Sequence, residues 1–324
     1  MMTSKRDESI KFSIIMPVFN VKEYVESAIE SVLNQTYSNI ELIIVNDGST
    51  DGSRKIVEDL SVKDSRIKLI HCPNRGLSMA RNTGLNIASG NFIFFMDSDD
   101  IVDINLFQIA HDKISSENQN VLMIGYEEIA SHYTYLGKNV LPGIHCSASI
   151  IHNILSKKLE NYVWQFIIAK SILSENLLFH PNVLFEDIDW TARFLSKIES
   201  VYYINKPLYK YRIRDSSITH TRNFQKAHDL LIVLDLLEKT LNENFPSELP
   251  NFRLWRKSLD LTIYFDFSIL GWETKRLRND MYSKILSYNG DGLDLKQKIK
   301  LILIKFRVMD FFHKLKGNDH EFRK

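Results

Sequence analysis

Two carboxylates follow one of the most apolar runs of the chain. Asp97 and Asp99, separated by Ser98, come directly after the run 92–96, Phe-Ile-Phe-Phe-Met. Because side chains alternate along an extended chain, Asp97 and Asp99 point to the same side. Carboxylate oxygens suit Mg²⁺ or Mn²⁺, which take substrate phosphates as further ligands. The pattern predicts a cation site that joins the protein to a diphosphate; the alternative is an acidic turn in which Asp99 or Asp100 caps the next helix.

Two other polar positions suggest nucleotide binding. Asp47 follows the apolar run 41–45, and Arg81 lies near the start of a predicted helix, next to Asn82. A carboxylate at Asp47 can accept the imide N–H of a uracil ring, or it can form an N-cap or an Asp-Gly turn with Gly48. Arg81 can place a cation beside a ribose or a phosphate; otherwise it is a surface arginine.

These positions lie at the ends of predicted strands. Five short apolar runs in the first 125 residues have the length and composition of buried strands: Phe12–Met16, Glu41–Val45, Ile67–His71, Asn91–Met96 and Val121–Gly125. Apolar residues at helical spacing separate the runs, as in 25–33. The alternation predicts an α/β fold, with a mostly parallel, Rossmann-like sheet flanked by helices. Such sheets bind ligands at the carboxyl ends of their strands.

The second half of the chain reads differently. It is expected to contain a helix around Trp164–Leu173, a helix from Glu186 to about Ser196, and a strand pair near Val201–Ile204 and Leu208–Ile213. From about Phe224 the apolar spacing is helical to the end. We therefore expect two domains, 1–222 and 223–324.

Composition excludes several classes of protein. The chain has 324 residues with 44% hydrophobic and 25% charged residues, which is typical of a soluble globular protein. The net charge of +1 gives no basic field for nucleic acid. Cys72 and Cys146 form neither a disulfide framework nor a metal knuckle, so a reducing, cytoplasmic compartment is expected. The amino terminus does not resemble a signal peptide, and no GxGxxG or P-loop motif is present.

Four segments carry a family resemblance. They are PVFN (17–20), VNDGSTDGS (45–53), NRGLSMARNTGL (74–85) and FMDSDD (95–100). Their order and spacing resemble the nucleotide-binding half of the family 2 glycosyltransferases, which have the GT-A fold. The resemblance implies that Asp47 binds uracil, that Asp97 touches the ribose, and that Asp99 holds Mn²⁺ or Mg²⁺. The residues that it places at a UDP-sugar donor are Pro17, Phe19, Asn20, Asp47, Arg81, Asp97, Ser98 and Arg212.

A second acidic pair, Glu186-Asp187, extends the resemblance, which implies that Asp187 is the general base. In an inverting transfer one group removes the acceptor proton while a metal neutralises the leaving diphosphate, so no protein general acid is needed. A glycoside hydrolase needs a second carboxyl group for its leaving oxygen. The alternative is a set of first-turn acids stabilised by the helix dipole, and Asp189 can share either role.

Three more residues have weaker assignments. Trp190, together with Glu186, can contact an acceptor sugar, although an indole on a helix is also typical of a core. Arg212 can meet the diphosphate. His220 can be a further metal ligand, or it can be structural.

The segment 295–316 contains seven Lys or Arg and one acid, Asp310. Leu295, Ile299, Ile302, Phe306 and Met309 share one face of a predicted helix. A basic amphipathic helix can lie on an anionic membrane; alternatively it packs on its own domain with lysines at the rim.

Together these observations predict an inverting, metal-dependent glycosyltransferase. It would move a hexose from a UDP-sugar to a glycan or an undecaprenyl-diphosphate-linked acceptor in surface polysaccharide synthesis (O-antigen, lipopolysaccharide or capsule), with a β-linkage. It would be a peripheral protein at the inner face of the cell membrane. The alternatives are a sugar-phosphate nucleotidyltransferase, which lacks support because no Gly-rich loop follows the first strand, and a catalytically silent sugar-binding scaffold.

Overall fold

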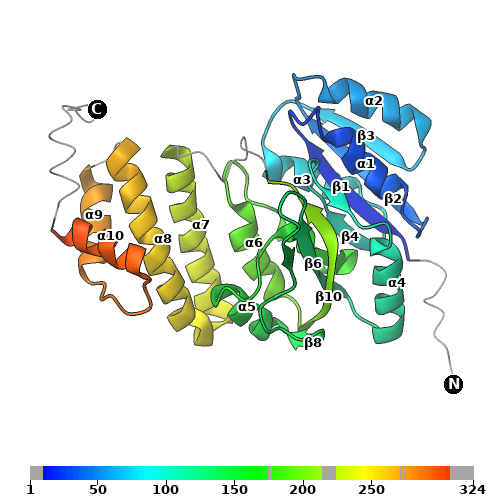
Figure 1. Ribbon diagram of the computed structural model, residues 1–324. Coiled ribbons are helices and arrows are strands. Elements are labelled where there is room, and N and C mark those ends of the chain that lie inside the picture. Colours follow the sequence, from blue (N-terminus) through cyan, green and yellow to red (C-terminus); the bar gives the residue numbers. More distant parts are fainter. Residues whose placement is uncertain (1–9, 174–176, 214–223, 271, 273–274, 307–324) are drawn as a thin grey trace. The chain divides into compact units, whose positions relative to one another are not determined.

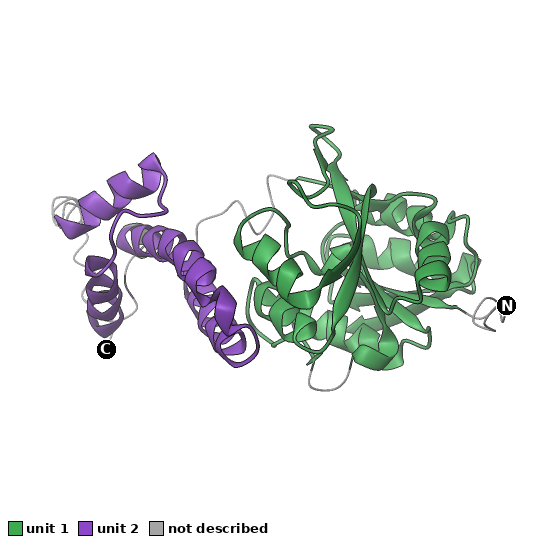
Figure 2. Ribbon diagram, turned by 90° about the horizontal axis from the view of Figure 1, so that it is seen from below, with its two compact units in different colours: residues 1–214 green, residues 215–324 purple. Residues whose placement is uncertain are grey.

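The computed structural model describes residues 10–173, 177–213, 224–270, 272 and 275–306. The chain forms two compact units, 1–214 and 215–324 (Figure 2). The boundary expected after residue 222 lies outside the described residues.

The first unit is built on a ten-stranded sheet (Figure 1). Its strands are β1 (Phe12–Val18), β2 (Ile40–Asp47), β3 (Ile67–Cys72), β4 (Phe92–Phe95), β5 (Ile101–Val102), β6 (Val121–Glu128), β7 (Thr134–Tyr135), β8 (Gly143–Cys146), β9 (Phe166–Ala169) and β10 (Ser200–Tyr211). The order is β3-β2-β1-β4-β9-β6-β10-β5, with β7 on β6 and β8 on β10. The β1–β2, β1–β4, β2–β3 and β6–β10 pairs are parallel. The carboxyl ends of these strands therefore meet at one edge of the sheet.

Helices cover both faces of this sheet. They are α1 (Val25–Leu33), α2 (Ser53–Lys63), α3 (Leu77–Ile87), α4 (Leu106–Glu117), α5 (Ser147–Leu155) and α6 (Glu186–Leu195). On one face, Ile14 of β1 joins a core with Ala28 of α1 and Phe107 of α4. On the other face, a Cβ on Gly84 of α3 would overlap the side chain of Ile15. Because only glycine avoids this overlap, Gly84 sets the close packing of α3 on the sheet.

All five strands expected in the first 125 residues are present, and so is the helix that begins at Glu186. The helix expected around Trp164–Leu173 is wrong. Residues 166–169 form β9, which is antiparallel to both β4 and β6. A short, fully buried apolar run has no periodicity that separates a strand from a helix, and the sheet decides the outcome.

The expected strand pair near Val201–Ile204 and Leu208–Ile213 is a single strand, β10. Its pairing with β6 shifts register on either side of Pro207. Proline has no N–H for the ladder, so it interrupts the pairing locally without ending the strand.

The second unit is helical, as expected. It contains α7 (Phe224–Asn244), α8 (Leu249–Leu270), α9 (Lys275–Leu286) and α10 (Leu295–Lys305). Leu234 and Leu237 on α7 are buried, and so are Ile263 and Phe267 on α8. Among the residues that the structure describes, no helix is both long and apolar enough to cross a membrane.

Candidate active site

The loops that follow β1 and β2 are joined at the carboxyl edge of the sheet. Asn20, with a φ of 51°, accepts a hydrogen bond on its Oδ1 from the N–H of Thr50 at 2.8 Å. Its own N–H donates to Ser49 Oγ at 3.2 Å. Phe19 is 46% exposed beside it, whereas Pro17 is buried within β1. The loop thus presents a ring to solvent while Asn20 fixes the backbone.

Asp47 ends β2 and is 4% exposed. Its Oδ1 accepts the N–H of Arg75 at 2.9 Å, and its Oδ2 accepts the N–H of Gly76 at 2.8 Å. Asp47 therefore holds the loop after β3 against the end of β2. The suggested N-cap is not observed, because Asp51 is the residue that accepts the N–H of Ser53 at the start of α2.

The loop that carries Asp97 and Asp99 is held by β10. Tyr209 donates its hydroxyl proton to Asp100 Oδ2 at 2.7 Å, and it accepts the N–H of Asp97 at 3.2 Å. The N–H of Arg212 donates to Asp100 Oδ1 at 2.7 Å, and Arg212 Nε donates to the carbonyl oxygen of Asp99 at 2.9 Å. These four hydrogen bonds fix the acidic loop to Tyr209 and Arg212.

The suggestion that Asp99 or Asp100 caps the next helix is wrong. The next element is β5, and α4 begins later, at Leu106. Asp100 is instead a buried acid, 1% exposed. Burial, with the nearby charges of Asp99 and Asp97, raises its pKa well above the ordinary value. Ser98 is 5% exposed between them.

Arg81 joins the two acidic groups. Its guanidinium, 3% exposed, donates from Nη2 to Asp97 Oδ1 at 2.9 Å and from Nη1 to Glu186 Oε1. The guanidinium carbon lies 5.4 Å from the ring centroid of Phe179. Burial opposes the charge, but the carboxylates of Asp97, Glu186 and Asp187 raise the pKa of Arg81. The surface-arginine alternative is therefore wrong, and the guanidinium contacts carboxylates rather than standing open to a nucleotide.

Asp187 faces this cluster from the first turn of α6. Removal from water and the neighbouring Glu186 carboxylate raise its pKa to about 8, although the Arg81 charge acts in the opposite direction. With a pKa of about 8 a fraction of this carboxyl group is ionised at physiological pH, and the ionised form can accept a proton. Asp189 is placed differently: its Oδ2 pairs with Arg193 Nε at 2.6 Å and with His180 Nε2 at 3.2 Å.

Trp190 is fully buried. Its indole N–H donates to the carbonyl oxygen of Leu177 at 2.6 Å, and its ring stacks on Phe179 with centroids 4.7 Å apart. The contact with an acceptor sugar is therefore wrong for Trp190, which belongs to the core between α6 and the sheet. His220 lies outside the described residues.

The acids of the site suit a divalent cation bound together with substrate. Within the described ranges no group of three or more His, Cys, Asp or Glu side chains could hold a metal ion alone. Mg²⁺ and Mn²⁺ in nucleotide sites use one or two carboxylates and complete their shell with phosphates and water. Asp97 is tied to Arg81 through Oδ1 only, and Asp99 is partly exposed, so the donor set fits that mode.

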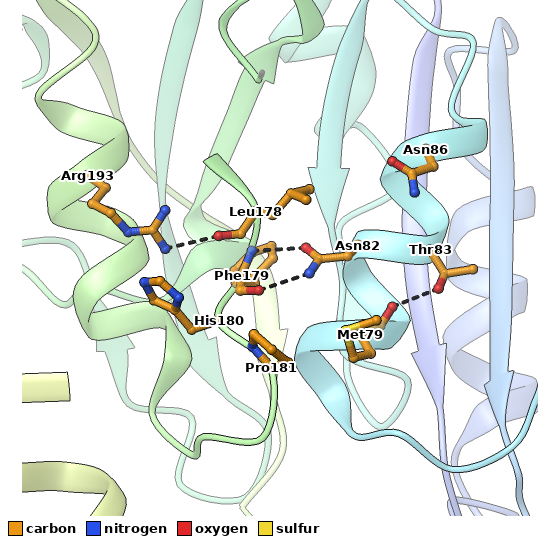
Figure 3. A pocket seen from close by; sticks show the side chains of 9 residues that line it. All are labelled: Met79, Asn82, Thr83, Asn86, Leu178, Phe179, His180, Pro181 and Arg193. Atoms are coloured by element: carbon orange, nitrogen blue, oxygen red, sulfur yellow. Dashed lines mark hydrogen bonds between the residues drawn. The ribbon is translucent and has the colours of Figure 1, made fainter. Parts of the chain in front are cut away.

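A separate pocket of about 430 Å³ lies between α3, the segment 178–181 and α6 (Figure 3). The residues that line it are Met79, Asn82, Thr83, Asn86, Leu178, Phe179, His180, Pro181 and Arg193. Apart from Asn82, the neighbour of Arg81, none of the residues singled out from the sequence is among them. Asn82 exchanges two 2.9 Å hydrogen bonds with the backbone of Phe179, so the pocket wall also anchors the segment that leads into α6.

The architecture matches solved structures over nearly the whole chain. TarS of S. aureus in complex with UDP-GlcNAc superposes with a TM-score of 0.69 at 19% identity, covering 95% of this chain and 91% of that one. The mannosyltransferase PcManGT from Pyrobaculum calidifontis, in complex with GDP-Man and Mn²⁺, gives a TM-score of 0.58 at 13% identity, covering 96% and 88%. The fold is the GT-A fold.

Sequence comparison identifies the family. Residues 13–170 match Glycosyl transferase family 2. The chain is 32% identical to the glycosyltransferase GlyA of Streptococcus pneumoniae over 78% of this chain and 38% of GlyA. It is 34% identical to EpsJ, an uncharacterized glycosyltransferase of Bacillus subtilis, over 64% of this chain and 62% of EpsJ. For the glycosyltransferase GlyG of S. pneumoniae the identity is 30%, over 68% of this chain and 77% of GlyG.

The chain belongs to family 2 of the glycosyltransferases, which confirms the resemblance found in the four segments. It spans less than two thirds of the length of GlyA and of EpsJ.

Proposed function

We propose that this protein is an inverting, metal-dependent glycosyltransferase. It transfers a hexose from a UDP-sugar to a hydroxyl group of a glycan or of a lipid-diphosphate-linked sugar, in the synthesis of a bacterial surface polysaccharide such as O-antigen or capsule. The observation that carries the proposal is the position of Arg81, which contacts both Asp97 and Glu186. The acids expected at the donor and the acids expected at the acceptor therefore share one cluster.

The donor end is formed by the loops after β1 and β2 and by the loop of Asp97. Each oxygen of Asp47 accepts one backbone N–H and keeps a second lone pair for the imide of a uracil ring. Phe19 stands exposed at the same edge, available to pack on the base. A nucleotide-sugar donor is further supported by the UDP-GlcNAc bound to TarS.

Asp99 would hold Mn²⁺ or Mg²⁺ together with the diphosphate, and Asp97 would contact the ribose. The bound cation supplies Lewis acidity that neutralises the negative charge of the leaving UDP. Asp187 takes the proton of the acceptor hydroxyl. The positive charge of Arg81 offsets the repulsion between the carboxylates of Glu186 and Asp97. It also limits how far the pKa of Asp187 is raised. Direct displacement inverts the anomeric centre, so an α-linked donor yields a β-linked product.

The experiment that tests the function is a panel of UDP-sugars assayed for UDP release with Mn²⁺, with and without a lipid-linked acceptor. We expect one donor to release UDP in an acceptor-dependent manner. Release of pyrophosphate would contradict the assignment. So would a panel in which UDP-sugars bind but none of them is turned over.

Asp99→Ala tests the cation site. Because Asp99 supplies a charged oxygen, its removal is expected to weaken Mn²⁺-dependent UDP binding by about one to two orders of magnitude. Isothermal titration with UDP, with Mn²⁺ and with EDTA, measures the difference. The matched control is Asp103→Ala, beyond the loop, which should leave both titrations unchanged. Equal UDP affinity of Asp99→Ala and wild type in Mn²⁺ would remove Asp99 from the site.

Membrane association is proposed for α10. Leu295, Ile299, Ile302 and Phe306 lie on one side of the helix and are 75%, 50%, 53% and 78% exposed. Leu301 and Ile304, on the other side, are buried. Helical spacing places Lys296 on one flank of the exposed stripe, and Lys298 and Lys305 on the other. Apolar residues between lysines are suited to the headgroup layer of an anionic membrane. The rest of the predicted segment, 307–316, lies outside the described residues.

Sedimentation with vesicles tests this surface. Vesicles containing phosphatidylglycerol should bind the protein more tightly than phosphatidylcholine vesicles, and the double variant Ile299→Ser/Phe306→Ser should bind about tenfold or more weakly. Leu286→Ser, which changes an exposed leucine of α9, is the matched control. If the double variant binds vesicles as tightly as wild type, or if the protein binds both kinds of vesicle equally, α10 is not a surface for anionic membranes.

A further inference from the structure

Six aromatic side chains pack together at the carboxyl ends of β6 and β10. This aromatic cluster consists of Tyr126, Tyr135, Tyr162, Trp164, Tyr209 and Tyr211. Trp164 stacks on Tyr209 with centroids 4.1 Å apart and planes 7° apart, and on Tyr162 at 4.7 Å and 9°. Tyr126 is opposite Tyr209 in the β6–β10 register and stacks on Tyr135 at 5.1 Å. The rings form one continuous wall.

The wall connects the two acidic groups of the site. At one end, the Tyr209 hydroxyl is hydrogen-bonded to Asp100 and to the N–H of Asp97. At the other end, Thr191 Oγ1 donates to the carbonyl oxygen of Asn161 at 3.1 Å. Thr191 lies one helical turn after Asp187, on the same face of α6. The backbone that leads into Tyr162 is therefore held about one helical turn from the proposed base.

The electrostatics agree with this placement. Burial, with the negative charges of Glu160 and Asp187 close by, raises the pKa of the Tyr162 hydroxyl. Glu160 is hydrogen-bonded to Tyr135, and burial raises its pKa. Trp164 and Tyr209 are buried, whereas Tyr135, Tyr162 and Glu160 keep part of their surface in contact with solvent. Tyr162, whose pKa responds to Asp187, is thus one of the accessible rings of the wall.

We propose that Tyr162, Tyr135 and Glu160 form a subsite for a pyranose acceptor beside Asp187. The inference rests on the proposed glycosyl transfer and adds the side chains that bind the acceptor sugar. One face of a pyranose ring presents axial C–H groups, which pack on the electron-rich face of an aromatic ring and leave water as they do so. A carboxyl group next to the rings accepts a hydrogen bond from a sugar hydroxyl.

The charges of the subsite argue against other acceptors. An open-chain polyol has no flat apolar face for the rings, so it gains little from the wall. A phosphate at this position would approach Glu160 and Asp187, and it would be repelled by whichever of these two carboxyl groups is ionised. A neutral sugar ring satisfies both the rings and the acids.

Saturation-transfer NMR on the full chain tests the subsite without requiring turnover. The probes are methyl β-D-glucopyranoside, methyl β-D-galactopyranoside, the 2-acetamido analogue of the glucoside, and ribitol, each with UDP and Mg²⁺. We expect transfer to the ring C–H protons of at least one glycoside and little to ribitol. Tyr162→Ala should reduce the glycoside signal by about fivefold to tenfold, because it removes the ring on which the sugar packs.

Two variants control for structure. Tyr162→Phe retains the ring and should retain binding, and Tyr133→Ala changes a tyrosine that is 60% exposed outside the cluster. Thermal unfolding of each variant reports whether the fold is intact. The proposal is overturned by no transfer to any glycoside, by ribitol signals that match the glycosides, or by an unchanged signal in Tyr162→Ala. UDP titrations on the same samples separate the subsite from the proposed function. Wild-type protein that fails to bind UDP would contradict the proposed function, whereas the glycoside signal is an independent result.

Discussion

Asp187→Asn is expected to abolish glycosyl transfer while UDP binding is retained. The amide has the shape of the carboxylate but cannot take a proton, and loss of a general base lowers the rate by about a thousandfold. Rates with the active donor measure the first effect, and titration with UDP and Mn²⁺ measures the second. The shape of the site should not change, because asparagine and aspartate have nearly the same size and shape.

Asp189→Asn is the matched control for this variant. Asp189 is bound by Arg193 and His180, so its change should lower stability and leave transfer within about one order of magnitude of wild type. A fully active Asp187→Asn, or an inactive but stably folded Asp189→Asn, would place the base elsewhere.

The raised pKa of Asp187 also predicts how the activity and the stability of the wild-type protein depend on pH. Burial and the adjacent Glu186 raise this pKa to about 8, and only the deprotonated form accepts the acceptor proton. The acceptor kcat/KM of wild type should therefore increase with pH and level off above about 8. Stability changes in the opposite direction: the unfolded chain loses this proton at its ordinary pKa while the folded chain retains it, so this carboxyl destabilises the fold as pH rises toward 8.

Arg81→Met is expected to destabilise the protein by about 3–5 kcal/mol, the usual effect of removing one partner from a buried ion pair. Asp97 and Glu186 would keep their charges in a site from which the compensating cation is gone. Because the Arg81 charge lowers the pKa of Asp187, whatever activity is left should need a higher pH than wild type. Denaturant unfolding and the pH–rate profile measure the two effects.

Arg54→Met provides the comparison for this loss. Arg54 pairs with Glu58 on the surface of α2, with 60% of its side chain exposed, so its removal should cost no more than about 1 kcal/mol. Equal losses for Arg54→Met and Arg81→Met would show that Arg81 is not an essential counter-ion. Partial recovery of stability in Arg81→Met/Glu186→Gln is expected, since that double variant also removes one of the stranded charges.

The strands of the donor half could be predicted from the sequence, because each is an apolar run that ends at polar residues. Asp47 is the last residue of β2 and Asp97 lies two residues beyond β4, and the parallel topology then brings them to one edge. The position of Asp187 relative to them could not be derived in this way. About 90 residues separate Asp97 from Asp187, and only Arg81 shows that they meet.

The features that sequence reasoning missed depend on tertiary packing. Asp100 follows Asp99 without any signal that it is buried, and its partner Tyr209 comes from a distant strand. The indole of Trp190 suits either an acceptor sugar or a core, and only the stacked ring of Phe179 decides for the core. The aromatic cluster draws on four segments, β6, β7, residues 162–164 and β10, and none of their tyrosines stands out in the sequence.

The antiparallel strand β9 also constrains how the protein is made. It separates β4 from β6, so β4 has its second neighbour only when residues 166–169 have been synthesised, and β6 gains its partner β10 later still. During translation the earlier strands present open hydrogen-bonding edges to the crowded cell. Synthesis of this one short segment closes the open edge of β4, and the other edge of β6 closes only when β10 follows.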